Sequence, residues 1–512
     1  MNLAGLLDEN AVRRPETVAL IDGRVGRERR TTYHRLGELA AATAERLSAA
    51  GIGEGSRVIV LVPMRAELYA TMIALWRIGA VAVFMDPSAG RRHLADCCGQ
   101  AEPDALIGIR KARLLVWTQP GLRRIRKRFY WGAQLAFDAE PRGNRLPCER
   151  ISDQAAILSF TSGSTGRPKC AVRSHRVLFA QFEALRGVID LVPGECDLAT
   201  MPVIALANLA AGLTTLIPDV DLRHPGRIDP APLFRQIKQW KPARCGASPA
   251  FLLAICEEAR RRSIQMPDFR KIHTGGAPVF PRSLREFSGT FVNASINVLY
   301  GSTEAEPVSH VSLREISGGD LEQMRRGRGL LVGAVSGGTE LRILADRWGE
   351  PYPAMAKEDF EALALPDGSV GEIVVSGAHV VPGYLNGIGD AGNKIKVDGV
   401  VWHRTGDAGS MDEAGRLWLA GRCSAKMRID GKTVYPFSIE CAAVETLDVA
   451  LAGCLPTETG YLLAIPGTGR KVRPDEIAKD IPRPERVVQL RDFPVDKRHN
   501  AKIDYQALKR RV

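Results

Sequence analysis

The stretch Thr161–Lys169 gathers small and hydroxyl-bearing residues that suit the binding of phosphate. Glycines leave backbone N–H groups unobstructed, and successive amides in a tight turn form a nest for an anion. Lys169 closes the run and adds a positive charge for the same anion. The spacing of Gly163, Gly166 and Pro168 is not that of a Walker A loop. The candidate phosphate ligands are Thr161, Ser162, Gly163, Ser164, Thr165, Gly166 and Lys169.

The residues that precede this stretch predict the element that would position it. Ala155–Phe160 is a short, mostly apolar run, which predicts a buried strand. A strand that leads into a glycine-rich turn favours a phosphate-binding site. A flexible Ser/Gly linker is the alternative that composition alone leaves open.

Four further short stretches also differ from ordinary loops. Each is a weak signal alone, because any glycine-rich turn can be structural, but together they occur in a fixed order along the chain. They are Thr274-Gly275-Gly276-Ala277-Pro278, Tyr300-Gly301-Ser302-Thr303-Glu304, Arg404-Thr405-Gly406-Asp407 followed by Gly421-Arg422, and Arg498-His499-Asn500-Ala501-Lys502-Ile503-Asp504.

Alternating helical and strand patterns predict an α/β fold. Helical periodicity over Thr32–Ala50 and Ala66–Ile78 alternates with strand patterns over Ser56–Pro63 and Ala80–Met85. This order implies parallel sheets joined by right-handed crossovers. A similar alternation covers 153–300, and shorter strands follow in 333–384. We therefore expect two parallel-sheet subdomains and a small β unit in residues 1–421, and a small α+β domain in residues 422–512.

Composition places the chain among ordinary globular proteins. Of its 512 residues, 45% are hydrophobic and 25% are charged, and the ten cysteines include no Cys-x-x-Cys pair. We expect neither a zinc site nor a disulfide framework, so a reducing cytoplasm fits best. The N-terminal residues do not have the pattern of a signal peptide. The apolar tract Val203–Pro218 is too short to span a bilayer, so no transmembrane segment is expected.

Part of the net charge of +12 is concentrated in residues 122–131, where five cations mix with aromatic residues. A solvated helical face is the ordinary interpretation of such a run. Peripheral contact with an anionic membrane and contact with nucleic acid are the alternatives. The chain has no zinc-finger, helix-turn-helix or RNA-binding signature, which argues against nucleic acid.

In order and spacing, the five motifs resemble those of the acyl-adenylate-forming superfamily, which includes acyl-CoA synthetases, luciferase-like enzymes and nonribosomal-peptide adenylation domains. The resemblance covers essentially the whole chain. It implies an enzyme that joins a small-molecule carboxylic acid to AMP, uses ATP and Mg²⁺, and releases pyrophosphate. Thr161–Lys169 would then hold the phosphates of ATP.

The resemblance also implies roles for the nucleotide-binding residues. Gly276, Ala277 and Pro278 would line the adenine pocket, and Tyr300 would stack on the base, for which an aromatic face is suited. Asp407 would accept hydrogen bonds from the ribose hydroxyls. Each of these residues also has a structural alternative, such as a core position for Tyr300.

The catalytic residues are implied in the same way. Thr303 would contact the α-phosphate, and Glu304 would be the ligand of Mg²⁺, which prefers carboxylate oxygen. Arg422 would lie beside the ribose and phosphate. Lys502 would bridge the substrate carboxylate and the α-phosphate, which stabilises the charge of the transition state. Gly301 and Ser302 belong to the same nucleotide-binding motif as Thr303 and Glu304.

Within the superfamily, the closest resemblance is to the β-lactone synthetases of long-chain olefin biosynthesis. It rests on FMDPSAGRR, GASPAFL, YGSTEAEPVS and FPVDKRHNAKI. In these enzymes the substrate is a β-hydroxy acid whose own hydroxyl attacks the activated carbonyl and releases AMP. Intramolecular attack gains effective concentration, so no thiol cosubstrate is needed.

Three departures from the family pattern leave alternatives open. Cys170 stands where the phosphate loop usually ends in glycine. Ser424 occupies the hinge of the family's small mobile C-terminal domain, where Asp or Lys is usual. The segment Pro202–Asn208 is aliphatic and ends in Asn, where the subfamily tends to have aromatics and an acid. A ligase that uses coenzyme A, an amine or a carrier protein is therefore the second hypothesis. A catalytically silent paralogue that binds acyl chains or nucleotide is the third, and an accessory role beside a biosynthetic partner enzyme is also open.

Overall fold

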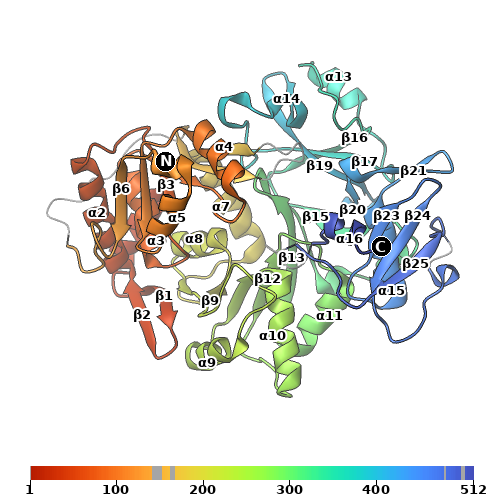
Figure 1. Ribbon diagram of the computed structural model, residues 1–512, viewed down its shortest axis with the longest axis horizontal. Helices are drawn as coiled ribbons and strands as arrows, with labels where there is room; N and C mark the ends of the chain where they lie inside the picture. Colours follow the sequence, from red (N-terminus) through yellow and green to blue (C-terminus); the bar gives the residue numbers. More distant parts are fainter. Residues whose placement is uncertain (1, 141–152, 162–167, 478–479, 497–501) are drawn as a thin grey trace. The chain divides into compact units, whose positions relative to one another are not determined.

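The computed structural model describes residues 2–140, 153–161, 168–477, 480–496 and 502–512. Two compact units make up the chain, and each is described by itself. Unit 1 comprises Met1–Asp219, Arg235–Pro242 and Ala378–Ala391, and unit 2 comprises Val220–Phe234, Ala243–Gly377 and Gly392–Val512. Figure 1 shows the course of the chain.

The larger sheet of unit 1 has the order β6-β5-β3-β4-β7-β8. All neighbouring strands are parallel except β7 and β8. One face of this sheet packs against α4, α5 and α6 in an apolar core. The strands are β3 (Arg57–Leu61), β4 (Val81–Phe84), β5 (Ala105–Ile109), β6 (Lys127–Trp131), β7 (Ala155–Thr161) and β8 (Lys169–Ser174).

A second group of paired strands in unit 1 contains β9 (Cys196–Ala199), β10 (Thr214–Leu216), β1 (Val18–Arg24) and β2 (Arg27–Thr32). The strands β9, β10 and β1 are parallel, and β2 returns antiparallel to β1. The helices of unit 1 are α1 (Leu3–Arg13), α2 (Tyr33–Ala49), α3 (Ala66–Arg77), α4 (Arg91–Ala101), α5 (Ala112–Thr118), α6 (Pro120–Arg123), α7 (His175–Ile189) and α8 (Pro202–Ala211).

The helix α2 illustrates why these residues adopt these elements. Thr32 lies at its N-cap and its hydroxyl accepts a hydrogen bond from the backbone N–H of Arg35 at 3.1 Å. This bond satisfies one of the N–H groups that a helix start leaves without a partner. The apolar face of α2, from Leu36 to Leu47, is buried. The helices and strands predicted between residues 32 and 85 are therefore confirmed, with ends that differ by one or two residues.

The basic stretch 122–131 does not form the helical face that its charge suggests. Its last part, Lys127–Trp131, is the strand β6, which pairs in parallel with β5. Phe129, Tyr130 and Trp131 are buried, and the Trp131 indole donates to the Thr71 hydroxyl at 3.0 Å. Hydrogen bonding to β5 and burial of three successive aromatics favour a strand over a helix here.

Unit 2 is built on a mixed sheet with the order β16-β17-β19-β20-β15-β14-β13-β12-β11, and β18 pairs with β19. The strands β11, β12 and β13 are parallel, and the later pairs are antiparallel. The strands are β11 (Arg244–Ala247), β12 (Lys271–Gly275), β13 (Ser295–Ser302), β14 (Ala305–Ser312), β15 (Leu330–Val335), β16 (Glu340–Leu344), β17 (Gly371–Ser376), β18 (Lys394–Val397), β19 (Val400–Met411) and β20 (Arg416–Arg422).

The helices of this part of unit 2 are α10 (Pro249–Arg261), α11 (Pro281–Thr290), α12 (Gly318–Arg325) and α13 (Lys357–Ala362). Two more helices, α9 (Pro230–Trp240) and α14 (Asp390–Asn393), have residues in both units. Parallel sheets with crossover helices in both units confirm the predicted α/β class.

The C-terminal part of unit 2 follows β20 with a small mixed sheet. The strands β23 and β24 are antiparallel, and β25 is parallel to β24. The elements are β21 (Met427–Ile429), β22 (Lys432–Val434), α15 (Pro436–Leu447), β23 (Gly453–Pro456), β24 (Tyr461–Pro466), β25 (Arg486–Leu490) and α16 (Tyr505–Lys509). The predicted division of the chain into 1–421 and 422–512 stays a proposal.

The described part of the chain contains nine cysteines, all of them free thiols. All except the half-buried Cys196 are buried. Across the same residues, every helix is too short or too polar to reach from one side of a bilayer to the other.

Candidate functional site

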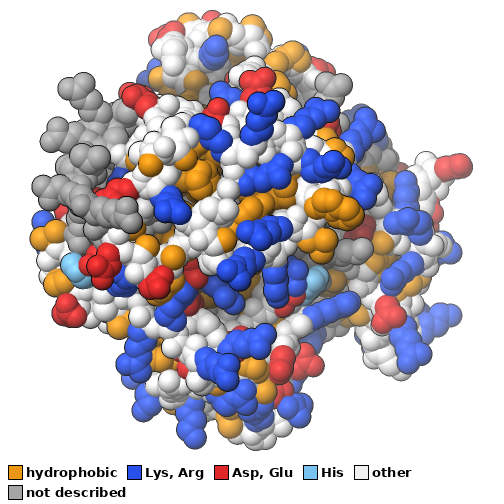
Figure 2. All heavy atoms as spheres, turned by 60° about the vertical axis from the view of Figure 1, so that its left-hand side comes forward, with side chains coloured by type: hydrophobic (Ala, Val, Ile, Leu, Met, Phe, Trp, Pro, Cys, Tyr) orange, Lys and Arg blue, Asp and Glu red, His pale blue; other side chains and the backbone are white. Residues whose placement is uncertain are grey.

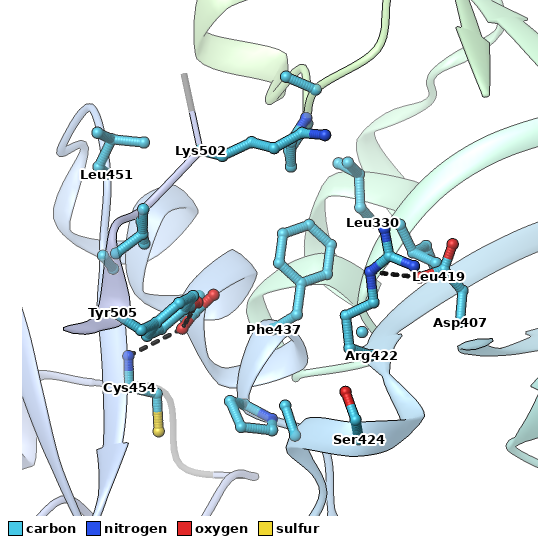
Figure 3. A pocket seen from close by; sticks show the side chains of 18 of the residues that line it. Leu330, Asp407, Leu419, Arg422, Ser424, Phe437, Leu451, Cys454, Lys502 and Tyr505 are labelled. Carbon is cyan, nitrogen blue, oxygen red and sulfur yellow. Dashed lines mark hydrogen bonds and ion pairs between the residues drawn. The ribbon is translucent and has the colours of Figure 1, made fainter. Parts of the chain in front are cut away.

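Unit 2 contains a cavity of about 780 Å³ that is lined by eight of the predicted site residues. This volume lies in the range of small-molecule sites, which is roughly 300–1,000 Å³. Its walls come from the carboxyl ends of β12 and β13, from β19 and β20, and from the C-terminal segment (Figure 3). The predicted residues on its walls are Gly276, Ala277, Pro278, Tyr300, Gly301, Asp407, Arg422 and Lys502.

Two glycines shape the part of the cavity next to β12 and β13. Gly276 has a φ of +79°, which favours glycine, and a Cβ added there would meet nothing within 4 Å. Its backbone therefore borders open space. At Gly301 an added Cβ would lie 2.7 Å from the carbonyl oxygen of Ala305, so the turn between β13 and β14 requires glycine for close approach.

Tyr300, Asp407 and Arg422 form one connected group. The Tyr300 hydroxyl donates to Oδ2 of Asp407 at 2.7 Å, and Nε of Arg422 lies 3.1 Å from Oδ1 of the same carboxylate. The backbone N–H of Asp407 donates to the Thr405 hydroxyl at 3.0 Å. Both carboxylate oxygens of Asp407 are thus held by side chains, one from β13 and one from the neighbouring strand β20.

Electrostatics couple the same three groups. Partial burial raises the pKa of Asp407, while Arg422, Tyr300 and Lys502 act in the opposite direction. Burial and the nearby Asp407 charge raise the pKa of Tyr300 well above its usual value. The Asp407 carboxylate raises the pKa of Arg422. Tyr300 therefore stays a neutral hydrogen-bond donor in this site.

Lys502 reaches the cavity from the C-terminal segment. Its backbone N–H donates to Oδ1 of Asp496 at 3.1 Å, and the Asp496 N–H donates to its carbonyl at 2.7 Å. This pair fixes the backbone from which the side chain extends. Figure 3 shows the side chain running over the cavity towards the side where Arg422 and Asp407 lie. Its charge is close enough to lower the pKa of Asp407.

Ser302 is the last residue of β13, and Thr303 and Glu304 form the turn to β14; none of the three is among the residues that line the cavity. The Glu304 backbone N–H donates to the Ser302 hydroxyl at 3.2 Å. Glu304 is buried, and its charge contributes to the raised pKa of Arg422. In the part of the chain that the structure describes, no group of three metal-ligating side chains occurs. One carboxylate fits Mg²⁺, because this ion keeps waters and binds substrate phosphates.

The predicted phosphate loop belongs to unit 1. Thr161 ends β7 and pairs with Lys169 of β8. Ser162, Gly163, Ser164, Thr165 and Gly166 lie outside the described residues. The Lys169 ammonium lies 5.8 Å from the centre of the Tyr384 ring, and its stem lies against Gly389.

The three departures from the family pattern occupy different surroundings. Cys170 packs in the apolar core beneath β8, and burial raises the pKa of its thiol to about 12. Ser424 is exposed and lines the cavity. The segment Pro202–Asn208 forms most of α8, and the side-chain amide of Asn208 is fully buried.

The segment after Arg422 is held by one aspartate. Lys426 Nζ lies 3.0 Å from Oδ1 of Asp346, and the Tyr435 hydroxyl donates to Oδ2 of the same carboxylate at 2.8 Å. The two contacts flank the hairpin of β21 and β22.

The sequence analysis missed other residues that line the cavity, among them Phe280, Phe437, Glu440 and Tyr505. The rings of Phe280 and Phe437 lie 6.1 Å apart and give the cavity an apolar wall. Glu440 is buried and accepts hydrogen bonds from the Cys454 N–H at 2.8 Å and the Tyr505 hydroxyl at 2.6 Å. Burial raises its pKa to about 7. No sequence motif marks these residues, because they come from separate segments of the chain and meet only in the tertiary fold.

The model of the family described as "AMP-binding enzyme" matches residues 7–385. The chain belongs to this family. The predicted superfamily is confirmed, and the chain is an ATP-dependent enzyme that forms acyl-adenylates. Enzymes of the AMP-binding family in general use ATP with Mg²⁺.

Similarity to individual proteins extends over nearly the whole chain. An olefin β-lactone synthetase of Stenotrophomonas maltophilia is 32% identical, covering 99% of this chain and 97% of its own length. A feruloyl-CoA synthase of an Amycolatopsis species is 27% identical, covering 87% of this chain and 86% of its own length. The predicted likeness to β-lactone synthetases is confirmed.

Solved structures support the fold. An amide bond synthetase from Marinactinospora thermotolerans superposes with a TM-score of 0.79 at 21% identity, covering 99% of both chains. At this identity the likeness concerns the fold alone.

Proposed function

We propose that this enzyme activates a β-hydroxy carboxylic acid as its acyl-adenylate and then closes it to a β-lactone. The structural support is the single cavity that brings Tyr300, Asp407 and Arg422 together with Lys502. The support for the second step is the 32% identity to an olefin β-lactone synthetase over nearly the full length of both chains.

In the first step a carboxylate oxygen of the substrate attacks the α-phosphorus of ATP. A new C–O–P linkage forms, the bond to the β-phosphate breaks, and pyrophosphate leaves. Lys502 would hold the carboxylate and the α-phosphate together, because a cation between two anions offsets their repulsion and stabilises the transition state. Thr303 would contact the α-phosphate, and the Thr161–Lys169 loop would hold the outer phosphates.

The nucleoside would bind along the other walls of the cavity. Tyr300 would stack on adenine beside Gly276, and Asp407 would accept hydrogen bonds from the ribose hydroxyls with Arg422 beside them. Ala277 and Pro278 would complete the adenine pocket, and Gly301 and Ser302 would approach the phosphates. Glu304 would hold Mg²⁺, which neutralises phosphate charge when it is bound.

In the second step the β-hydroxyl oxygen attacks the carbonyl carbon of the same acyl-adenylate. The new C–O bond closes a four-membered ring, the bond to AMP breaks, and the hydroxyl proton is released. Because nucleophile and electrophile belong to one molecule, the step gains effective concentration and needs no coenzyme A.

Ligation to coenzyme A is the second candidate function. The observation that favours it is the 27% identity to a feruloyl-CoA synthase over 87% of this chain. An amine or a carrier-protein thiol would intercept the same acyl-adenylate.

The decisive experiment incubates the purified protein with ATP, Mg²⁺ and a long-chain β-hydroxy acid, with and without coenzyme A, and identifies products by mass spectrometry. A control acid of equal length lacks only the β-hydroxyl. We expect a product of substrate mass minus water that forms without coenzyme A, and none from the control acid. A thioester that forms only with coenzyme A would overturn lactone formation while leaving adenylation intact.

A further inference from the structure

Two large apolar side chains of α5 are exposed on the surface of unit 1. Leu114 is 68% exposed and Trp117 is 71% exposed. They are three residues apart, so they lie on the same side of the helix. The opposite side of α5 carries Ala112 and Val116, which are buried in the core beneath the sheet. Leu114 and Trp117 therefore do not contribute to the core.

Basic residues surround this apolar pair in the chain. Residues 110–128 contain eight Lys or Arg and no Asp or Glu. These cations are Arg110, Lys111, Arg113, Arg123, Arg124, Arg126, Lys127 and Arg128. Within the described residues, none of the eight forms an ion pair with a carboxylate. All of them except Arg128 are exposed. In Figure 2 Lys and Arg side chains gather around exposed hydrophobic side chains on one face of the molecule.

The basic surface continues into a cleft beside Lys111. This cleft has a volume of about 490 Å³, and Arg24, Arg27 and Arg65 line it with Lys111. Its one lining carboxylate, Asp22, is buried and already paired with Arg29 at 2.8 Å. The cleft therefore presents an excess of positive charge of a kind that suits phosphate groups.

We propose that the α5 surface, defined as residues 110–128 with the Lys111 cleft, docks on an anionic phospholipid membrane. Trp117 and Leu114 enter the interfacial region, where tryptophan is favoured because its ring is amphipathic. The surrounding cations bind lipid headgroups, and the cleft receives a headgroup phosphate.

The chemistry favours a membrane over nucleic acid. A nucleic-acid surface needs cations for phosphates, but it does not explain an exposed leucine beside the tryptophan. An interfacial surface needs both cations and large apolar side chains, and α5 provides them together. The aromatic residues of 127–131 are buried, so the apolar contact comes from α5 and not from β6. This inference does not depend on the acceptor of the acyl-adenylate.

The test is flotation of the full-length protein with vesicles of phosphatidylcholine alone or mixed with phosphatidylglycerol. We expect binding only to the phosphatidylglycerol vesicles, with affinity that falls as salt rises. Arg123→Glu combined with Arg124→Glu should weaken binding at least about thirtyfold, since each cation near an anionic surface contributes roughly fivefold in affinity and each introduced glutamate adds repulsion. Arg270→Glu combined with Arg314→Glu, two exposed arginines of unit 2, changes the net charge equally and should leave binding unchanged.

A second readout uses Trp117 itself. The Leu114→Ala, Trp117→Ala double variant should lose about tenfold in vesicle affinity while adenylating a water-soluble acid as the unaltered protein does. Tryptophan emission should shift to the blue on vesicle binding, and Trp117→Phe should remove the shift. Equal binding to both vesicle types, equal loss in the two arginine pairs, or binding to duplex DNA or RNA without binding to vesicles would overturn the proposal.

Discussion

Asp407 and Arg422 lie directly opposite each other on the paired strands β19 and β20, and an ion pair of 3.1 Å joins their side chains. The Tyr300 hydroxyl holds the second carboxylate oxygen of Asp407. The carboxylate is therefore fixed from two sides before any nucleotide binds. Such preorganisation lowers the ordering cost of binding.

Replacing Asp407 by Asn should weaken ATP binding about tenfold. The amide keeps the shape of the side chain but loses the charge that strengthens hydrogen bonds to ribose hydroxyls, and it offers one acceptor oxygen in place of two. Calorimetry with ATP measures the change. Asp430→Asn, in the exposed turn after β21, is the matched control and should bind as the unaltered protein does. Unchanged affinity in Asp407→Asn would remove this residue from the nucleotide site.

Lys502→Ala should lower acid-dependent pyrophosphate exchange by at least about a hundredfold, because the lysine acts on charge that develops in the transition state. ATP affinity should change little, since the lysine would contribute mainly to that transition state. Lys471→Ala, an exposed lysine of the same C-terminal segment, serves as the control. Exchange that survives in Lys502→Ala would exclude the bridging role.

Gly276→Ala should separate binding from folding. The added methyl group meets no atom within 4 Å, so the cost of folding is only the strain of φ +79°, about 1 kcal/mol. The methyl group would occupy space proposed for adenine, so ATP binding should fall sharply in calorimetry while thermal unfolding shifts little. By contrast, Gly301→Ala should unfold the turn, because its Cβ would lie 2.7 Å from the Ala305 carbonyl oxygen. Normal ATP binding by Gly276→Ala would place adenine elsewhere.

Glu440→Gln should change how stability depends on pH. Burial raises the pKa of Glu440 from 4.5 to about 7, so the folded protein holds a proton that the unfolded chain releases. The associated contribution to the free energy of unfolding is complete below pH 4.5 and is lost as pH rises through about 7. The amide of Glu440→Gln does not titrate, so the variant does not show this pH-dependent loss of stability, which in the unaltered protein amounts to at most about 3 kcal/mol.

Urea unfolding of both proteins between about pH 5 and pH 8 measures this effect. The unaltered protein should lose stability relative to Glu440→Gln as the pH rises. Glu458→Gln replaces an exposed glutamate of the same segment and should follow the unaltered protein. Parallel curves for Glu440→Gln and the unaltered protein would show that the carboxyl is ionised in the folded state.

Sequence patterns predicted the α/β architecture because most strands here are short apolar runs bounded by turns. Glu340–Leu344 coincides with β16, and Ala155–Phe160 is one residue shorter than β7. The prediction of a helical face over residues 122–131 was wrong because a run of cations masks the alternation of faces, and long basic side chains reach water from a helix or a strand. The pairing of β6 with β5 is a long-range contact that no local pattern contains.

The residues of the candidate site were also predicted only in part. Tyr300, Asp407, Arg422 and Lys502 belong to short motifs, and the structure brings them around one cavity. Phe437 and Glu440 were missed because a phenylalanine and a glutamate within a helix have ordinary structural roles. Their position depends on how α15 packs against β20 and β23. The roles of all these residues in catalysis stay proposals.

The buried cysteines allow local opening of the fold to be measured without changing the sequence. A thiol such as Cys170, whose pKa burial raises to about 12, resists alkylation until the element that covers it opens. Cys97 and Cys170 report on the core beneath the larger sheet of unit 1, whereas Cys441 and Cys454 report on α15 and β23. Timed alkylation followed by peptide mapping would therefore rank the opening free energies of separate regions of the unmodified chain.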